Sequence, residues 1–404
     1  MDLKTPATVQ RESTRHIKEK LATAYSWDDG RQDQWNDWRW QQRNAIRTAR
    51  DVAHLLPSID IDGLERLLLR QKLLITPYFL ELILRYAEEN PHAAVNPLLV
   101  QVVPDGVEKS TTGFDHETEN WENPAEMKTP ICQHKYDNRV IIRASNVCNA
   151  YCQFCFEALR TLSTEKQDRK AALQGQYWRD TLEYLAATPC VEEIILSGGE
   201  PLMLSDQKLA GMLDDLRGTR PDAVIRLHTR ALTFNPYRTT PSLVEALGRN
   251  SVGAVGLHVC HPAEISTEFL DAVGKLRSVV PLIFANIPLL GTVNDDAKTL
   301  EELCMTLYRN GILPYYLYHF MPFSPGSERF FVKVEKGCEL MRGLKRRKSN
   351  LAVPEYVLPH LSGKYTVSID DPSRPSAHYT HDTHGNPVFQ FTNWRGERCD
   401  WANG

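Results

Sequence analysis

Residues 140–155 read Val140-Ile-Ile-Arg-Ala-Ser-Asn-Val-Cys148-Asn-Ala-Tyr-Cys152-Gln-Phe-Cys155. A β-rich run is followed here by three cysteines within eight residues. Further β-rich runs occur downstream, and helical patterns stand between them. Strands that alternate with helices are typical of a parallel sheet covered by helices. We therefore expect the cysteines at the carboxyl end of the first strand, where such folds place their active sites.

The alternation predicts an α/β fold with six βα-type units. Six units are too few for a closed eight-unit barrel, so we expect an open, partial (βα)6 barrel. The predicted strands span residues 140–144, 193–197, 223–227, 254–258, 281–285 and 313–318. The predicted helices between them include residues 206–216, 240–247, 268–279 and 299–309.

The remaining sequence divides around this barrel. We expect a polar N-terminal arm over residues 1–34, a helical region over 35–130, the barrel over 131–333 and a C-terminal extension over 334–404. Thr76-Pro77 is typical of a helix start, with threonine as N-cap and proline in the first turn. In the extension, a helix near residues 335–345 precedes irregular sequence.

Composition excludes several classes of protein. Of the 404 residues, 42% are apolar and 24% are charged, as in an ordinary soluble globular protein. The net charge of −4 argues against a nucleic-acid-binding polyelectrolyte. No run of 18 apolar residues predicts a transmembrane helix, and the polar N-terminus does not resemble a secretory signal. We expect a cytoplasmic protein without a membrane or nucleic-acid partner.

The nine cysteines are too few and too scattered for a disulfide scaffold in a chain of this length. Cys148, Cys152 and Cys155 are the exception. They could be small buried hydrophobic residues, or they could bind a metal. Structural zinc usually takes two separated pairs of ligands, and no second C-x-x-C pair occurs. An iron–sulfur cube suits three thiolates better, because three irons are held and the fourth stays open.

A second motif, Gly198-Gly199-Glu200-Pro201, follows the second predicted strand. Tandem glycines let the backbone approach a ligand closely. Together the two motifs resemble the radical S-adenosylmethionine (SAM) superfamily. The resemblance implies that the cysteines bind a [4Fe–4S] cluster and that Gly198, Gly199 and Glu200 help to bind SAM. It also implies that Phe154 lies over the adenine, and that an external reductant such as flavodoxin or ferredoxin supplies the electron.

More of the chain resembles lysine 2,3-aminomutase and its relatives, from about Trp35 to near the C-terminus. This resemblance implies that pyridoxal 5′-phosphate (PLP) forms an imine with Lys364, whose pKa burial would depress. Arg230 and His258 are assigned to cofactor binding, with an ion pair and a structural histidine as the respective alternatives. The segments that carry the resemblance are 35–44, 75–78, 258–265, 293–295, 313–318 and 384–396.

The sequence departs from this family where the substrate would bind. The family places two aspartates near the ammonium of a lysine substrate. Here Met321 stands in one position, and no carboxylate lies near Pro359. Where the family has an arginine for the substrate carboxylate, this chain has Glu157, with Arg160 as a possible replacement. Because a buried ammonium needs a charged partner, the absence of both aspartates argues against free lysine as the substrate.

The leading hypothesis is a PLP-dependent radical SAM aminomutase that acts on an amino acid or related amine other than lysine. The alternative is a radical SAM epimerase, dehydrogenase or other tailoring enzyme on the same scaffold without PLP. A third hypothesis is a non-enzymatic protein, either an iron–sulfur electron carrier or a zinc-stabilised binding protein. We expect a small-molecule substrate and a homo-oligomer.

Overall fold

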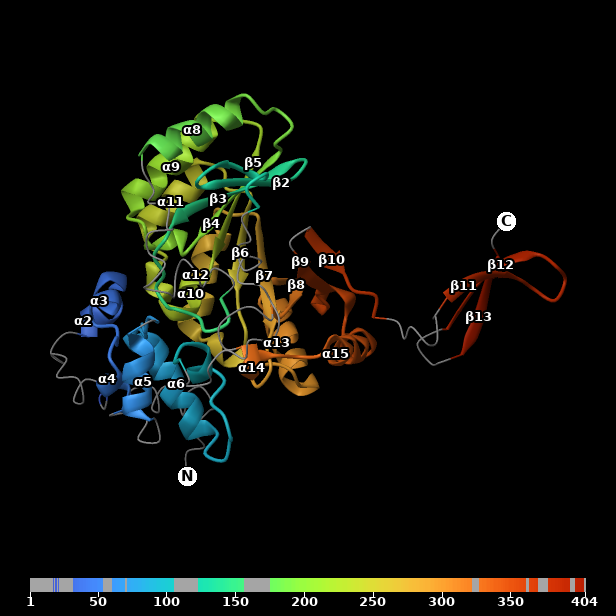
Figure 1. Cartoon of the computed structure of the whole chain (residues 1–404), viewed down its shortest axis with the longest axis horizontal. Coiled ribbons are helices and arrows are strands. Elements are labelled where there is room, and N and C mark those ends of the chain that lie inside the picture. Colours follow the sequence, from blue (N-terminus) through green and yellow to red (C-terminus); the bar gives the residue numbers. More distant parts are fainter. Residues whose placement is uncertain are drawn as a thin grey trace.

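Figure 1 shows the fold of the chain in a computed structural model. The structure describes residues 17, 19, 21, 32–53, 60–69, 71–104, 123–155, 175–321, 327–360, 363–369, 377–392 and 397–402. In these parts no helix is both long and apolar enough to cross a membrane. Glu157 and Arg160 lie outside the described residues.

A curved parallel sheet forms the centre of the molecule, and its strands follow the order of the chain. All six predicted strands are confirmed. They are β3 (Arg139–Ser145), β4 (Glu193–Gly198), β5 (Val224–Thr229), β6 (Ala254–His258), β7 (Leu282–Leu289) and β8 (Leu313–His319). One parallel strand, β9 (Glu355–His360), was not predicted. It pairs with β8, and its residues Tyr356 and Val357 are buried.

Antiparallel strands extend the sheet at both edges, so that it has ten strands. At one edge β1 (Met127–Thr129) and β2 (Cys132–Tyr136) lead into β3. At the other edge β10 (Gly363–Thr366) pairs with β9 and carries Lys364. Strand β1 lies within the region predicted to be helical. It is only three residues long, too short to show a periodicity in the sequence.

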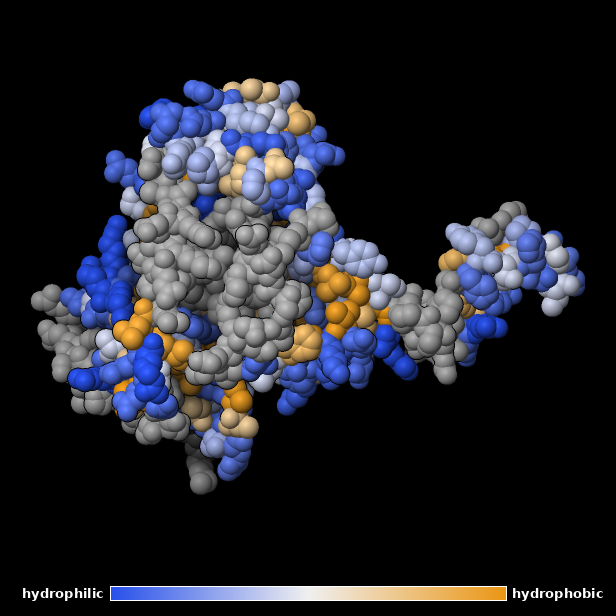
Figure 2. Space-filling model, in the orientation of Figure 1, coloured by the Kyte–Doolittle hydropathy of each residue, from blue (hydrophilic) through white to orange (hydrophobic). Residues whose placement is uncertain are grey.

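Helices cover the outer face of the sheet, as the alternation predicted (Figure 1). Their apolar sides, with Leu213, Leu243, Phe269 and Leu303, share one core with the inner strands. Figure 2 shows the outer surface near α8 and α9 to be mostly hydrophilic. The helices are α8 (Gly175–Ala186), α9 (Asp206–Thr219), α11 (Pro241–Arg249), α12 (Thr267–Arg277), α13 (Ala297–Arg309) and α15 (Val334–Arg347).

Short helices connect these elements. Two of them, α10 and η5, follow the strands that carry the candidate site. The short elements are η1 (Leu99–Gln101), η3 (Pro201–Met203), α10 (Ala231–Phe234), η4 (Pro236–Arg238), η5 (Pro262–Glu264), α14 (Ser327–Phe330) and η6 (Asn350–Ala352).

The N-terminal helices pack against one end of the barrel with a core of their own. Thr76 caps α6 by accepting the Phe79 N–H, as predicted, and its hydroxyl donates to the Phe234 carbonyl of the barrel. Ile17 and Leu21 are fully buried in this core, so these two residues are not part of a free arm. The helices are α2 (Gln32–Trp35), α3 (Trp38–Arg43), α4 (Ala49–Ala53), α5 (Ile61–Leu68) and α6 (Pro77–Glu89).

The end of the chain forms a second sheet instead of the irregular sequence that we expected. Strands β11 (Ala377–His381), β12 (Pro387–Thr392) and β13 (Arg398–Ala402) pair antiparallel. Figure 1 shows this sheet apart from the barrel. Its strands are short and rich in polar residues, so their alternation was weak in the sequence.

Candidate active site

One pocket of about 360 Å³ lies inside the curved sheet and contains the predicted site. Inward-facing residues of β3–β8 line it, together with the loop after β3 and the edge strand β10. Every predicted site residue that the structure describes lines this pocket. These residues are Cys148, Cys152, Phe154, Cys155, Gly198, Gly199, Glu200, Arg230, His258, Met321 and Lys364.

The cysteine loop, residues 146–155, follows β3 directly, so its position was correctly predicted. Cys148 and Cys155 pack against a small cluster that includes Tyr151, and the Cys152 thiol accepts a hydrogen bond from Arg230. No disulfide joins any two cysteines of the described residues. In the described part of the chain, no three potential ligand side chains already converge on a common point that could hold a metal.

The Gly198-Gly199-Glu200 turn is bonded to the start of the cysteine loop. The Gly199 N–H donates to the Ser145 carbonyl at 2.7 Å, and the Glu200 N–H donates to the Val147 carbonyl at 2.9 Å. A Cβ at Gly199 would lie 2.7 Å from the Val147 oxygen and 2.9 Å from its nitrogen. Gly198 has φ +121°, which side chains rarely adopt. The two glycines therefore allow the end of β4 to pack directly against the backbone of the cysteine loop.

Replacing Gly199 by alanine should destabilise the fold by about 1–3 kcal/mol, because a backbone contact cannot relax around the new Cβ. Denaturant unfolding of the two proteins measures the difference. Gly211→Ala in α9 is the matched control, since a Cβ at that position would have nothing within 4 Å. That change should be neutral or stabilising by up to about 1 kcal/mol. Equal effects of the two alanines would contradict the close approach.

Glu200 is buried and holds the ends of two strands together. One carboxylate oxygen accepts the Leu202 N–H at 3.0 Å and the Thr229 hydroxyl at 2.7 Å, and the other accepts the Arg230 N–H at 2.8 Å. Burial raises the pKa of this carboxyl group. A carboxylate has about four acceptor sites. One site therefore remains for a ligand in the pocket.

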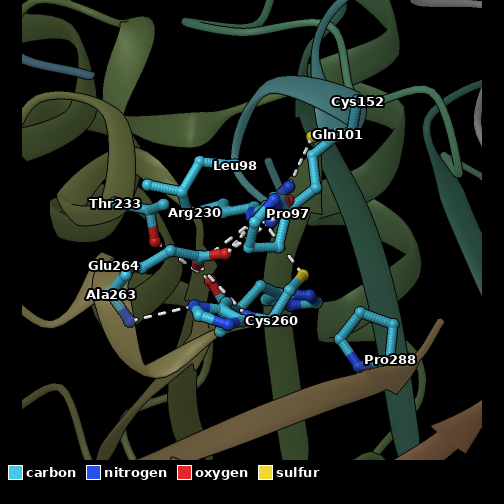
Figure 3. A network of polar contacts seen from close by, with 12 residues as sticks. Pro97, Leu98, Gln101, Cys152, Arg230, Thr233, Cys260, Ala263, Glu264 and Pro288 are labelled. Carbon is cyan, nitrogen blue, oxygen red and sulfur yellow. Dashed lines mark hydrogen bonds and ion pairs between the residues drawn. The ribbon is translucent and has the colours of Figure 1, made fainter. Parts of the chain in front are cut away.

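Arg230 meets a thiol and a buried carboxylate instead of an open phosphate or carboxylate site (Figure 3). Its guanidinium donates to Cys152 Sγ at 2.8 Å and pairs with Glu264 at 3.4 Å. The Phe154 ring lies 5.0 Å from the guanidinium carbon. Burial opposes the charge, but the facing thiols and Glu264 outweigh it and raise the pKa of Arg230.

Lys364 enters the pocket from β10. Although the residue as a whole is exposed, its Nζ lies 4.8 Å from the centre of the Tyr316 ring and 5.5 Å from that of Tyr318. Its backbone N–H donates to the Tyr136 hydroxyl at 3.0 Å. Burial of the ammonium, together with Arg139 and Arg226 nearby, lowers the pKa of Lys364 from 10.5 to about 8. A larger fraction of Lys364 is therefore the uncharged, nucleophilic amine than for an ordinary lysine at the same pH.

Sequence reasoning missed several polar residues inside the barrel. His228 Nε2 and Asn286 Oδ1 both line the pocket, are buried, and have no hydrogen-bond partner among the described residues. Burial lowers the pKa of His258 to about 4 and that of His228 well below its ordinary value, so both rings are neutral. The alternation Arg226-Leu-His228-Thr-Arg230 in β5 was the available signal, because alternate residues share one face.

The fold and the site define a class of enzymes. Residues 142–304 match the family model described as the Radical SAM superfamily. This family implies a [4Fe–4S] cluster, SAM, a small-molecule substrate and a reductant. Among solved structures, native anSMEcpe with bound AdoMet and Cp18Cys peptide matches 51% of this chain and 58% of its own, at 14% identity and a TM-score of 0.38.

Within this class, the chain belongs to the L-lysine 2,3-aminomutase family. The L-lysine 2,3-aminomutase of Acetoanaerobium sticklandii is 32% identical over 341 residues, which are 83% of this chain and 79% of the relative. The putative L-lysine 2,3-aminomutase of Aquifex aeolicus is 30% identical over 376 residues, which are 91% of this chain and 95% of the relative. The predicted family and fold class are thereby confirmed.

Proposed function

We propose that this chain is a PLP-dependent radical SAM aminomutase that moves an amino group between adjacent carbons of an amino acid or related amine other than lysine. One observation carries the proposal. The amine of Lys364 and the thiols of Cys148, Cys152 and Cys155 line the same pocket, although they come from opposite ends of the barrel sequence. A radical reaction at a carbon beside a covalently held nitrogen needs both groups in one chamber.

The donor set fits an iron–sulfur cluster. Three thiols on one loop line the pocket, and a [4Fe–4S] cluster with three cysteine ligands leaves one iron open. The three thiols do not converge on one point, so binding requires at least one of these side chains to rotate toward the metal. We assign Cys148, Cys152 and Cys155 as the ligands. Gly198, Gly199 and the remaining acceptor site of Glu200 are assigned to SAM, with Phe154 beside them.

The other end of the pocket fits PLP. Arg139 and Arg226 lie near the Lys364 amine and offer positive charge to a phosphate. Arg226 also pairs with Glu193 at 3.0 Å, which fixes its position. The unpartnered His228 Nε2 and Asn286 Oδ1 supply polar atoms for a ring with polar substituents. These groups are buried, so a ligand that satisfies them would gain hydrogen bonds that water cannot easily provide.

Different residues of the chain would react with the cofactor, orient it and exclude water. When bound, PLP supplies an aldehyde for an amine to attack, and the cluster with SAM supplies a radical that abstracts hydrogen from carbon. Lys364 provides the attacking amine and keeps it largely uncharged above about pH 8. Arg139 and Arg226 orient the phosphate. The rings of Tyr316 and Tyr318 pack around the amine and restrict water at this end.

The charges of the pocket support a substrate other than lysine. Among the described residues that line it, Glu200 is the sole carboxylate, and three donors already occupy it. Met321 lines the wall where a lysine-specific relative would be expected to carry an aspartate. A substrate ammonium would therefore lose water without gaining a charged partner from these residues. The assignments of Glu157 and Arg160 to the substrate remain predictions.

The test is an anaerobic ultraviolet–visible spectrum of the reconstituted protein, before and after borohydride reduction, followed by peptide mapping. We expect an iron–sulfur band and a pyridoxyl group fixed to Lys364. An iron–sulfur band with no pyridoxyl group would overturn the aminomutase proposal and leave a radical SAM enzyme without PLP. Amines can then be screened as substrates, with lysine expected to react poorly.

The lowered pKa of Lys364 predicts how PLP attachment depends on pH. At pH 7 about one amine in ten is neutral at a pKa of about 8, against about one in three thousand at the ordinary value. The attachment rate should therefore rise with pH and level off above about pH 8. Stopped-flow absorbance after mixing the full chain with PLP measures it. Arg139→Met should move the midpoint to higher pH, and a wild-type midpoint near 10.5 would contradict the assignment.

A further inference from the structure

We propose that Arg230 is a positioning residue that sets the reduction potential of the cluster through its hydrogen bond to Cys152. Gln101 and Glu264 hold the guanidinium in place. The inference rests on the proposed function in one respect only, the assignment of Cys152 as a cluster ligand. It goes further by giving a role to a pocket-lining cation whose guanidinium is already bound by Cys152, Cys260, Gln101 and Glu264.

The geometry of the Arg230 network (Arg230, Gln101, Cys152, Cys260 and Glu264) is shown in Figure 3. Nη1 donates to Cys152 Sγ at 2.8 Å. Nη2 donates to Cys260 Sγ at 3.2 Å and to the Gln101 side-chain oxygen, and it lies 3.4 Å from a Glu264 oxygen. One guanidinium therefore joins the cysteine loop to the loop after β6.

The surroundings leave Arg230 little freedom. Its guanidinium carbon lies 5.0 Å from the centre of the Phe154 ring and 4.7 Å from that of Phe234. Its own N–H donates to Glu200, which fixes the backbone. The Gln101 carbonyl accepts the Gln153 N–H at 2.8 Å, so the N-terminal helical region also fastens the cysteine loop. The donor and the thiol are thus positioned by several independent contacts.

A simple structural ion pair does not explain this arrangement. Glu264 is fully buried and also accepts the Gln101 side-chain N–H at 2.9 Å and the Cys260 N–H at 3.1 Å. The carboxylate is therefore well satisfied, whereas Arg230 directs an N–H at sulfur. A neutral thiol is a weak acceptor. The contact becomes strong when the sulfur carries the negative charge of a metal-bound thiolate, since hydrogen bonds to ionised groups are about twice as strong.

The effect on reduction follows from charge. An added electron makes the cluster more negative, and a fixed cation at a ligand sulfur stabilises that state more than the oxidised one. Hydrogen bonds to cluster sulfurs and the local charge are among the factors that set such potentials. Removing the cation should therefore make the cluster harder to reduce, so that its potential becomes more negative.

The double variant Arg230→Met with Glu264→Gln tests this inference without leaving one charge buried alone. Nη1 bonds Cys152 directly whereas Glu264 pairs with Nη2, so losing the nearer cation and its N–H outweighs losing the carboxylate. We expect the double variant to contain as much iron as the wild-type protein. At a fixed potential at which the cluster is only partly reduced, it should contain about tenfold less reduced cluster than the wild type, which corresponds to 59 mV for one electron. Potentiometric titration followed by electron paramagnetic resonance gives both values. Arg230→Lys keeps the charge, so the potential of its cluster should lie between those of the wild type and the double variant. Cys260→Ala, which changes another partner of the same guanidinium, should leave the potential unchanged.

The outcomes separate the two proposals. If the wild-type protein binds no iron, the proposed function fails and the role of Arg230 has no basis. If the cluster assembles and the double variant has the wild-type potential, the proposed function stands and the role of Arg230 is wrong. A loss of SAM affinity at an unchanged potential would also overturn it, in favour of a SAM-binding arginine. Should the double variant fail to fold, Arg230→Lys alone decides by the same titration.

Discussion

Lys364→Ala should abolish the pyridoxyl adduct and lower amino-group migration by about a thousandfold or more, the scale on which an essential nucleophile contributes. The reason is geometric. The Lys364 amine reaches the pocket over two tyrosine rings, and burial lowers its pKa to about 8. Lys135, the other lysine that lines the pocket, forms a 2.9 Å ion pair with Glu126. Borohydride trapping followed by mass spectrometry measures the adduct, and product formation measures turnover.

Lys345→Ala is the matched control, because this lysine is exposed in the last turn of α15 and does not line the pocket. It should keep both the adduct and the activity. The [4Fe–4S] band and the reductive cleavage of SAM should survive in Lys364→Ala, since the cysteine loop is untouched. Retention of a borohydride-fixed pyridoxyl group in Lys364→Ala would show that another amine holds the cofactor.

Cys152→Ser should have the second large effect, a loss of the cluster. Iron should fall from about four per chain to well below that number, because the hard hydroxyl of serine is a poor replacement for a thiolate ligand. Reductive cleavage of SAM should then fall by about a thousandfold or more. Iron analysis and quantification of 5′-deoxyadenosine measure the two effects. Cys148→Ser and Cys155→Ser should behave alike.

Cys190→Ser provides the control for the cluster. This cysteine is exposed and lies away from the pocket-lining residues, so its replacement should change neither the iron content nor SAM cleavage. A wild-type cluster in all three single variants of the loop would refute the ligand assignment. If only one of the three variants lost the cluster, another side chain would be able to replace the cysteine at the other two positions as a ligand.

Much of the fold could be predicted, because the central strands are apolar runs separated by capped helices. The strand β9 was missed because Pro354 and Pro359 flank or interrupt its apolar residues, and proline usually argues against an inner strand. Strands β1 and β10 have three and four residues, too few for a pattern. Their pairing depends on the curvature of the whole sheet, which no local sequence signal specifies.

The residues of the candidate site could likewise be predicted only in part. The spacing of Cys148, Cys152 and Cys155 and the Gly198-Gly199 pair were visible as local motifs, whereas Lys364 could be found only through family resemblance. Tyr136 and Arg139 carry no motif at all. They lie near Lys364 because the two edges of the sheet approach one another, with the Tyr136 hydroxyl bonded to the Lys364 backbone. Such a contact between distant segments exists only in the folded chain.

This contact also bears on the order in which the enzyme matures during synthesis. Tyr136 and Lys364 are 228 positions apart, while each parallel strand pairs with the one translated just before it. The sheet can therefore grow strand by strand as the chain leaves the ribosome. The β9–β10 hairpin is the last part of this sheet to be made, and it alone brings the amine. The metal-binding half of the chamber can thus form on a nascent chain, whereas the covalent half must wait until the β9–β10 hairpin has been made.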